Sequence, residues 1–165
     1  MKSAILSVLV TNHFGVLTRV TNLFGRRGYN IKALSVGETE NPALSRITIL
    51  TEGDHATLDQ IQKQLSKLED VKKATIIPDS RLLSRELVLI KVRISDAKIG
   101  ELEQFLAAYD ARIVSSTQNS AIVKASNTTG RINELIAALR PFGIMEMART
   151  GPTALELGEV TLSEL

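Results

Sequence analysis

The sequence contains no cysteine and no tryptophan, and aromatic residues make up only 4% of its 165 residues. Without cysteine the chain can form no disulfide, no catalytic thiolate and no cysteine-ligated metal site, which fits a reducing compartment. Twenty basic and eighteen acidic residues leave a formal charge of +2. So weak a field does not favour a nucleic acid as the partner.

Long apolar runs and the usual catalytic motifs are also missing. The apolar stretch near the N-terminus is far shorter than the about 20 residues of a membrane span, so we expect no membrane span, no targeting segment and a cytoplasmic chain. Phosphate-loop, dinucleotide-binding, zinc-protease and hydrolase motifs do not occur. His13 and His55 stand without a carboxylate or histidine at ligand spacing. We predict no catalytic residue, metal site or cofactor in this chain.

Hydrophobic periodicity and turn signals predict a βαββαβ order in the first half of the chain. Gly28 after a basic pair is a helix stop, Asp54 is a helix cap, and the segment 39–42 is a hairpin turn. The expected elements are a strand at residues 5–10, a helix from residue 16 to Gly28, strands at 31–38 and 44–51, a helix after Asp54, and a strand at 71–77.

The same order returns after the turn at residues 78–81. Its expected elements are a strand at 87–94, a helix at 99–109, strands at 111–117 and 120–125, a helix at 132–139, and a strand at 144–149. We therefore predict an α+β fold of two tandem ferredoxin-like domains, at residues 1–78 and 85–150, with a linker at 79–84 and a loosely ordered tail at 151–165. Helices cover one face of such a sheet, so its edges favour a homodimer.

The turn at residues 11–17 is the most informative stretch, because it joins a strand to the start of a helix. Free N–H groups at a helix N-terminus attract an anion such as a carboxylate, and Gly15 lets a ligand approach the backbone. Asn12 adds an amide there, and Asn30 can supply another from a neighbouring subunit. The pattern alone leaves a ligand site and a plain structural turn as equal alternatives.

Longer segments resemble a known family. The N-terminal half closely resembles the ACT domain of acetolactate synthase small subunits, and the likeness continues through residues 85–92 and 148–151. It is carried by Leu6 to Val10, Asn12, Gly15 to Val20, Arg26-Arg27-Gly28-Tyr29-Asn30-Ile31 and Leu44-Ser45-Arg46-Ile47-Thr48-Ile49. The resemblance implies a dimer of ACT domains aligned edge to edge, with an effector between the helix turn of one chain and the second strand of the other. The implied effector residues are Asn12, Gly15, Val16, Leu17, Asn30 and Ile31.

The resemblance also implies a function. It indicates a non-catalytic regulatory subunit that activates the catalytic, or large, subunit of acetolactate synthase in branched-chain amino acid biosynthesis. It further implies feedback inhibition by valine, leucine or isoleucine. Thiamine diphosphate, Mg²⁺ and FAD are assigned by the resemblance to the separate catalytic subunit. His13 and Phe14 stand where many relatives have smaller or polar residues, which leaves the effector preference open.

Two other classes of protein share the βαββαβ order. RNA-recognition modules place a glycine and alternating aromatic rings in their third strand, and residues 44–49 contain none. We therefore expect no nucleic acid partner. A small standalone enzyme on the same fold is the second alternative, and turnover by the purified chain would favour it.

Overall fold

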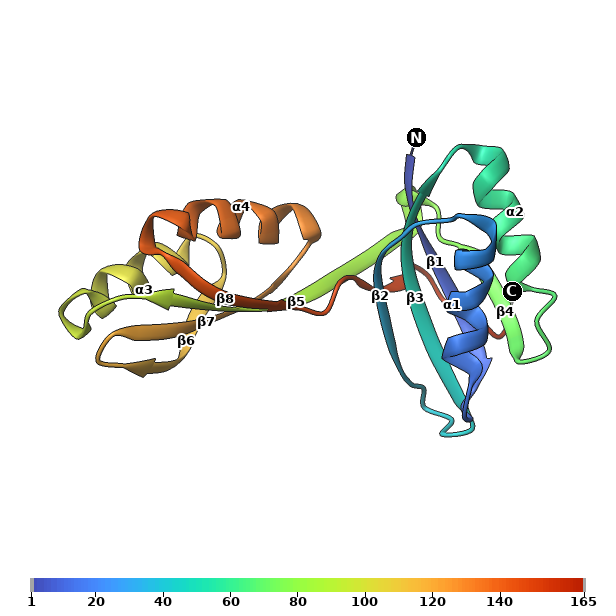
Figure 1. The fold of residues 1–165 in the computed structure, drawn as a ribbon, viewed down its shortest axis with the longest axis horizontal. Coiled ribbons are helices and arrows are strands. Elements are labelled where there is room, and N and C mark those ends of the chain that lie inside the picture. The colour runs from blue at the N-terminus through green and yellow to red at the C-terminus, as the bar shows by residue number, and fades with distance from the viewer. Residues whose placement is uncertain (1, 165) are drawn as a thin grey trace. The chain divides into compact units, whose positions relative to one another are not determined.

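The computed structural model describes residues 2–164, with Asp96 described through its backbone alone. The chain forms two compact units, Met1–Ser84 together with Pro152–Leu165, and Arg85–Gly151. Each unit carries two α-helices on an antiparallel sheet (Figure 1). The predicted tandem α+β fold is confirmed.

Unit 1 follows the predicted βαββαβ order. Its elements are β1 Lys2–Thr11, α1 Val16–Arg27, β2 Ile31–Glu38, β3 Leu44–Gly53, α2 His55–Leu65 and β4 Val71–Ile76. The sheet order is β2-β3-β1-β4, so β2 and β4 form the two edges. Strand β1 lies in the centre, which explains its continuous apolar run: Leu6 and Val8 pack against the helices, while Ile5 lies in a separate cluster.

Helix α1 begins and ends where the sequence predicts, and α2 begins where it predicts but ends at Leu65, before Leu68 of the predicted apolar stripe. Helix α1 lies between Gly15 and Gly28, which have φ of 86° and 69°, a left-handed conformation that glycine adopts without strain. The side chain of Asp54 accepts a hydrogen bond from the N–H of Thr57 at 2.7 Å and so caps α2. Buried residues on the two helices close the core over β1 and β3: Val16, Val20, Phe24, Leu58, Ile61 and Leu65.

The prediction of a loosely ordered tail is wrong for residues 153–156. This segment forms strand β9, Thr153–Glu156, which pairs with β5, and it belongs to unit 1. Ala154 is buried against Ile5 and Ile77, on the face of the sheet away from the helices. The physical reason is that this face of β1 carries the apolar side chains of Ile5 and Leu9, which need a cover. The predicted linker at 79–84 is a 3₁₀ turn, Asp79–Arg81, followed by the start of β5.

Unit 2 repeats the order with β5 Leu82–Arg93, α3 Ile99–Ala107, β6 Ala111–Thr117, β7 Ser120–Asn127, α4 Thr129–Leu139 and β8 Ile144–Arg149. The strands are ordered β6-β7-β5-β8. An ion pair between a buried carboxylate and a partly exposed guanidinium joins its two ends: Glu86 on β5 is 3% exposed and accepts a hydrogen bond from Arg149 Nε at 2.7 Å. The hydroxyl of Thr129, at the start of α4, donates to the same carboxylate at 2.9 Å.

Candidate functional site

The turn between β1 and α1 has the geometry of a backbone anion site. Gly15 takes φ 86° and ψ −10°, and among the described residues no side chain caps the first N–H groups of α1. Val16 is buried beneath the helix, whereas Leu17 is 40% exposed and Phe14 is 99% exposed. An acceptor bound at this turn would therefore meet free N–H groups with apolar side chains beside them.

Asn12 ties the turn to the β2–β3 hairpin. Its backbone N–H donates to the carbonyl of Ala43 at 2.8 Å. Its side-chain amide donates to Glu38 Oε1 and to the carbonyl of Pro42, both at 3.0 Å. The structure thus brings Asn12, the Gly15 turn and the C-terminal end of β2 together.

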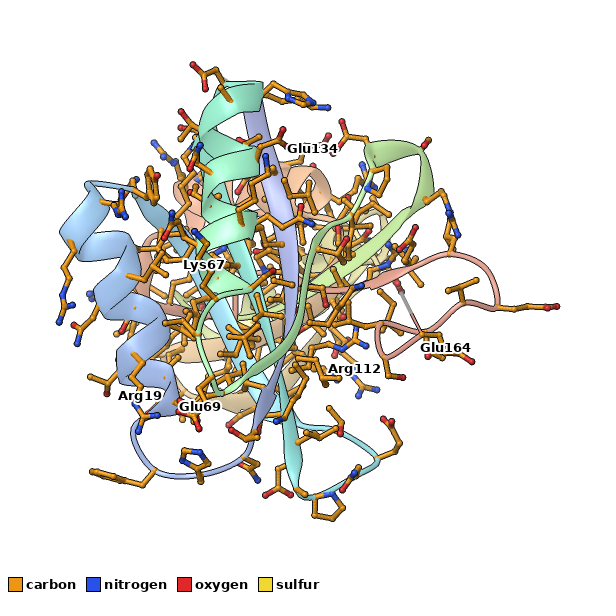
Figure 2. All side chains as sticks on the ribbon, turned by 90° about the vertical axis from the view of Figure 1, so that its right-hand side faces the viewer. Arg19, Lys67, Glu69, Arg112, Glu134 and Glu164 are labelled. Atoms are coloured by element: carbon orange, nitrogen blue, oxygen red, sulfur yellow. The ribbon has the colours of Figure 1, made fainter. Side chains whose placement is uncertain are left out.

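Asp70 is a member of this region that sequence reasoning missed. It is 8% exposed and lies just ahead of β4, where Arg19 of α1 donates to its Oδ2. His13 Nε2 lies 2.8 Å from Asp70 Oδ1, and the Thr11 hydroxyl donates to the same oxygen at 3.3 Å. The expectation that His13 has no carboxylate near it is wrong, because the fold brings one from far along the chain. Figure 2 shows Arg19 and Glu69, the neighbour of Asp70, at the same end of unit 1.

The Asp70 cluster predicts a pH-dependent stability. Burial opposes ionisation of Asp70, but the hydrogen bonds and charges of Arg19 and His13 outweigh it and hold the pKa of Asp70 below its ordinary value. A lowered pKa stabilises the fold above the unfolded-state value of about 3.9, and this contribution is lost as the pH falls through the folded-state pKa. Urea unfolding should therefore show Asp70→Asn less stable than wild type at neutral pH, with the gap shrinking below about pH 4.

Glu69→Gln is the matched control for that experiment, since Glu69 is exposed and adjacent in the chain. It should show little difference from wild type at either pH. A gap between Asp70→Asn and wild type that is the same at neutral and acid pH would contradict an ionised Asp70 as the source of the stability.

Asn30 and Ile31 lie at the other end of unit 1 from the turn. Helix α1 has 12 residues, which span about 18 Å, and Asn30 follows its far end. The carbonyl of Asn30 accepts a hydrogen bond from the Thr51 hydroxyl at 2.6 Å, and Ile31 packs partly against the core. A single chain does not bring these two residues to Gly15. Strand β2, which starts at Ile31, is an edge of its sheet.

Other kinds of site were also sought. No group of three or more His, Asp or Glu side chains is placed to hold a metal ion among the described side chains. Within residues 2–164, no helix is long and apolar enough to cross a bilayer.

The fold and turn of unit 1 define a class of protein. Residues 6–73 match a family described as AHAS small subunit-like ACT domain, and residues 85–158 match one described as small subunit of acetolactate synthase. Unit 1 is therefore an ACT domain with the glycine turn and the open edge strand described above.

Whole-chain comparisons identify the family. A Methanothermobacter thermautotrophicus protein named probable acetolactate synthase small subunit is 41% identical over 159 residues, 96% of this chain and 95% of its own. The Escherichia coli acetolactate synthase isozyme 3 small subunit is 38% identical, over 94% of this chain and 96% of its own. The crystal structure of the Thermotoga maritima acetolactate synthase small subunit is 36% identical, with a TM-score of 0.89, and the match covers 97% of this chain and all of that one. The chain belongs to the acetolactate synthase small subunit family.

Proposed function

We propose that this chain is a non-catalytic regulatory subunit of acetolactate synthase that binds a branched-chain amino acid between two copies of unit 1. The observation that carries the proposal is the uncapped start of α1 behind Gly15, with Asn12 and Glu38 beside it. The effector carboxylate would accept hydrogen bonds from the N–H groups of Val16 and Leu17. The carboxylate of Glu38 would attract its ammonium group.

The open edge of β2 supports a homodimer as the form that completes this site. Antiparallel pairing of two β2 strands about their middle, at Leu34 and Ser35, would set Asn30 of one copy opposite residue 39 of the other. Residue 39 follows Glu38, which accepts a hydrogen bond from Asn12 at 3.0 Å. Asn30 and Ile31 of one copy would then flank the Gly15 turn of the second copy. Within one chain, neither residue reaches that turn.

The apolar rim of the turn supports an aliphatic effector. Leu17 is exposed beside the helix start and Ile31 is partly buried at the edge strand, so a second copy would bring two branched side chains to one ligand. Valine, leucine or isoleucine would bury its side chain there. Phe14 projects from the same turn and would set which of the three fits best.

The proposal assigns the chemistry to a separate subunit. In it, this chain activates the catalytic subunit in the cytoplasm, and thiamine diphosphate, Mg²⁺ and FAD belong to that partner. Bound amino acid would lower the activity because it favours the less active state of the complex.

Valine should stabilise the isolated chain against heat. A ligand at about 100 times its dissociation constant adds roughly 2.7 kcal/mol to the apparent stability, enough for a clear rise in melting temperature. Differential scanning calorimetry with L-valine, L-leucine and L-isoleucine measures the shift, with D-valine as the matched control that should give a smaller one.

Two results would contradict this function. One is the absence of any shift with all three amino acids, especially if a single-stranded RNA gives one instead. The other is pyruvate consumption by the purified chain alone. The proposal requires turnover only after the catalytic subunit is added, at a rate above that of the catalytic subunit by itself.

A further inference from the structure

Unit 1 contains a cavity of about 520 Å³ on the face of its sheet away from the helices. Its floor includes Ser7 and Leu9 of β1 and Arg46 of β3. The tail that follows β9 forms its cover, through residues 158–163. The volume lies within the range of small-molecule sites, roughly 300–1,000 Å³. This cavity is separate from the Gly15 turn and needs no second copy of the chain.

The floor of the cavity carries a cation with unused donors. Arg46 is partly buried, and its Nη1 donates to Ser7 Oγ at 3.2 Å, where Ser7 is 1% exposed. Within the described part of the chain this is the one hydrogen bond of the guanidinium, which has five N–H donors. Burial lowers the pKa of Arg46, and the charge of Glu40 offsets part of that effect. A carboxylate is the group that such a guanidinium binds best, through two parallel hydrogen bonds.

The wall of the cavity supplies charge of the opposite sign. Glu40, Glu156 and Glu159 line it, and Glu156 is paired with Arg81 at 3.2 Å. Among residues 2–164, Glu40 and Glu159 form no ion pair within 4.0 Å, so their charges remain available to a cationic group. The rest of the lining combines hydroxyl and amide side chains with an aliphatic part: Leu9, Leu44, Ile77, Leu155, Val160 and Leu162. A ligand with one negative group, one positive group and a small apolar body matches all three surfaces.

We propose that this cavity is a second ligand site, which binds a small zwitterionic amino acid with an aliphatic side chain. The carboxylate lies on Arg46 and Ser7, the ammonium faces Glu40 and Glu159, and the side chain contacts Leu9 and the tail. This inference goes beyond the proposed effector site, because unit 1 alone supplies every contact.

The tail is built to close over such a ligand. Leu162 is buried, and the N–H and hydroxyl of Thr161 donate to Glu164 Oε2 at 2.8 and 2.6 Å, which shapes the last turn. Figure 2 shows Glu164 on this loop, beyond β9. Leu157 is held by two hydrogen bonds: its N–H donates to the Arg81 carbonyl at 2.7 Å, and Arg81 Nη2 donates to its carbonyl at 3.3 Å. Residues 158–160 between these ties are exposed, and Gly158 has φ of 109°. The cover can therefore open for entry without disturbing the core of the sheet.

The test uses the full chain with Gly15→Asp, which disables the proposed effector turn and so separates the two sites. Titration calorimetry with L-valine should still show one site per chain, and Arg46→Met in the same background should weaken that binding by about ten- to a hundredfold. Isobutylamine, which lacks the carboxylate, and 3-methyl-2-oxobutanoate, which lacks the ammonium, should both bind more weakly than valine. Loss of all valine binding on Gly15→Asp alone, in a folded chain, would overturn the inference.

Glu40→Gln combined with Glu159→Gln keeps the test decisive if Arg46→Met does not fold, because both glutamates are exposed at the rim. This double variant should lose the preference for valine over 3-methyl-2-oxobutanoate while its circular dichroism matches wild type. An unchanged preference would show that the tail packs over this cavity without an amino acid binding in it. If valine binds with dependence on Arg46 and gives no regulation through Gly15, the second site stands and the proposed effector site fails.

Discussion

Replacing Arg149 with methionine should cost about 3–5 kcal/mol of unfolding free energy, because Glu86 would stay buried without its cation. Glu86 is 3% exposed, and Arg149 donates to it through Nε at 2.7 Å and through a second guanidinium nitrogen. Arg149 also donates to Asn133 Oδ1 of α4 at 3.0 Å. The pair therefore joins β5, β8 and α4, and the loss should fall on unit 2.

The exposed pair of Lys91 and Glu146 on the same two strands is the matched control. Its atoms lie 2.9 Å apart, but the Glu146 side chain is 72% exposed, so solvent screens the pair and Glu146→Gln should cost little of the unfolding free energy. Urea unfolding followed by circular dichroism measures both variants. Glu86→Leu combined with Arg149→Met should recover most of the stability, since no unpaired charge is left. A small, equal loss for Arg149→Met and Glu146→Gln would show that burial adds nothing to the pair.

Local signals in the sequence predicted most of this fold. Helix α1 ends at Gly28 because a left-handed residue stops a helix, and α2 begins after Asp54 because a carboxylate can bond the free N–H groups. Both effects act within four residues of chain. Strand β9 in the tail was not predicted, because it is only four residues long and lies between Gly151 and the irregular segment that holds Gly158. Its ordering comes from the apolar face of β1 and not from its own periodicity.

The candidate sites divide in the same way. The Gly15 turn could be found from sequence, because a glycine and Asn12 lie next to a helix start. Asp70 could not, since it meets Arg19 across 51 residues through the pairing of β1 with β4. The contact between Arg46 and Ser7 joins residues that are 39 positions apart in the chain. The cavity around this contact exists because the tail covers it, which the sequence does not reveal. Long-range contacts of this kind depend on strand register, which the sequence does not display locally.

Gly15→Asp should leave activation of the catalytic subunit within about twofold of wild type while raising the valine concentration for half-inhibition by roughly 10- to 100-fold. The reason is electrostatic. A carboxylate at residue 15 would stand beside the N–H groups of Val16 and Leu17, where it would compete with the effector carboxylate for the same donors and repel it. The buried face of α1 at Val16, Val20 and Phe24 is untouched, so the fold should survive.

Gly15→Asn separates charge from strain. Both side chains have the same size, and asparagine and aspartate both tolerate the φ of 86° at this position better than other non-glycine residues. A Cβ there meets Arg19 Nη2 at 3.6 Å, an ordinary contact, so neither variant clashes with its surroundings. In a reconstituted complex, Gly15→Asn should retain much more inhibition by valine than Gly15→Asp does. Equal loss of inhibition in both variants would mean that the backbone of this turn, and not its electrostatics, controls the response. Loss of activation in both, with reduced circular dichroism, would make Gly15 a folding residue and remove the turn as an effector site.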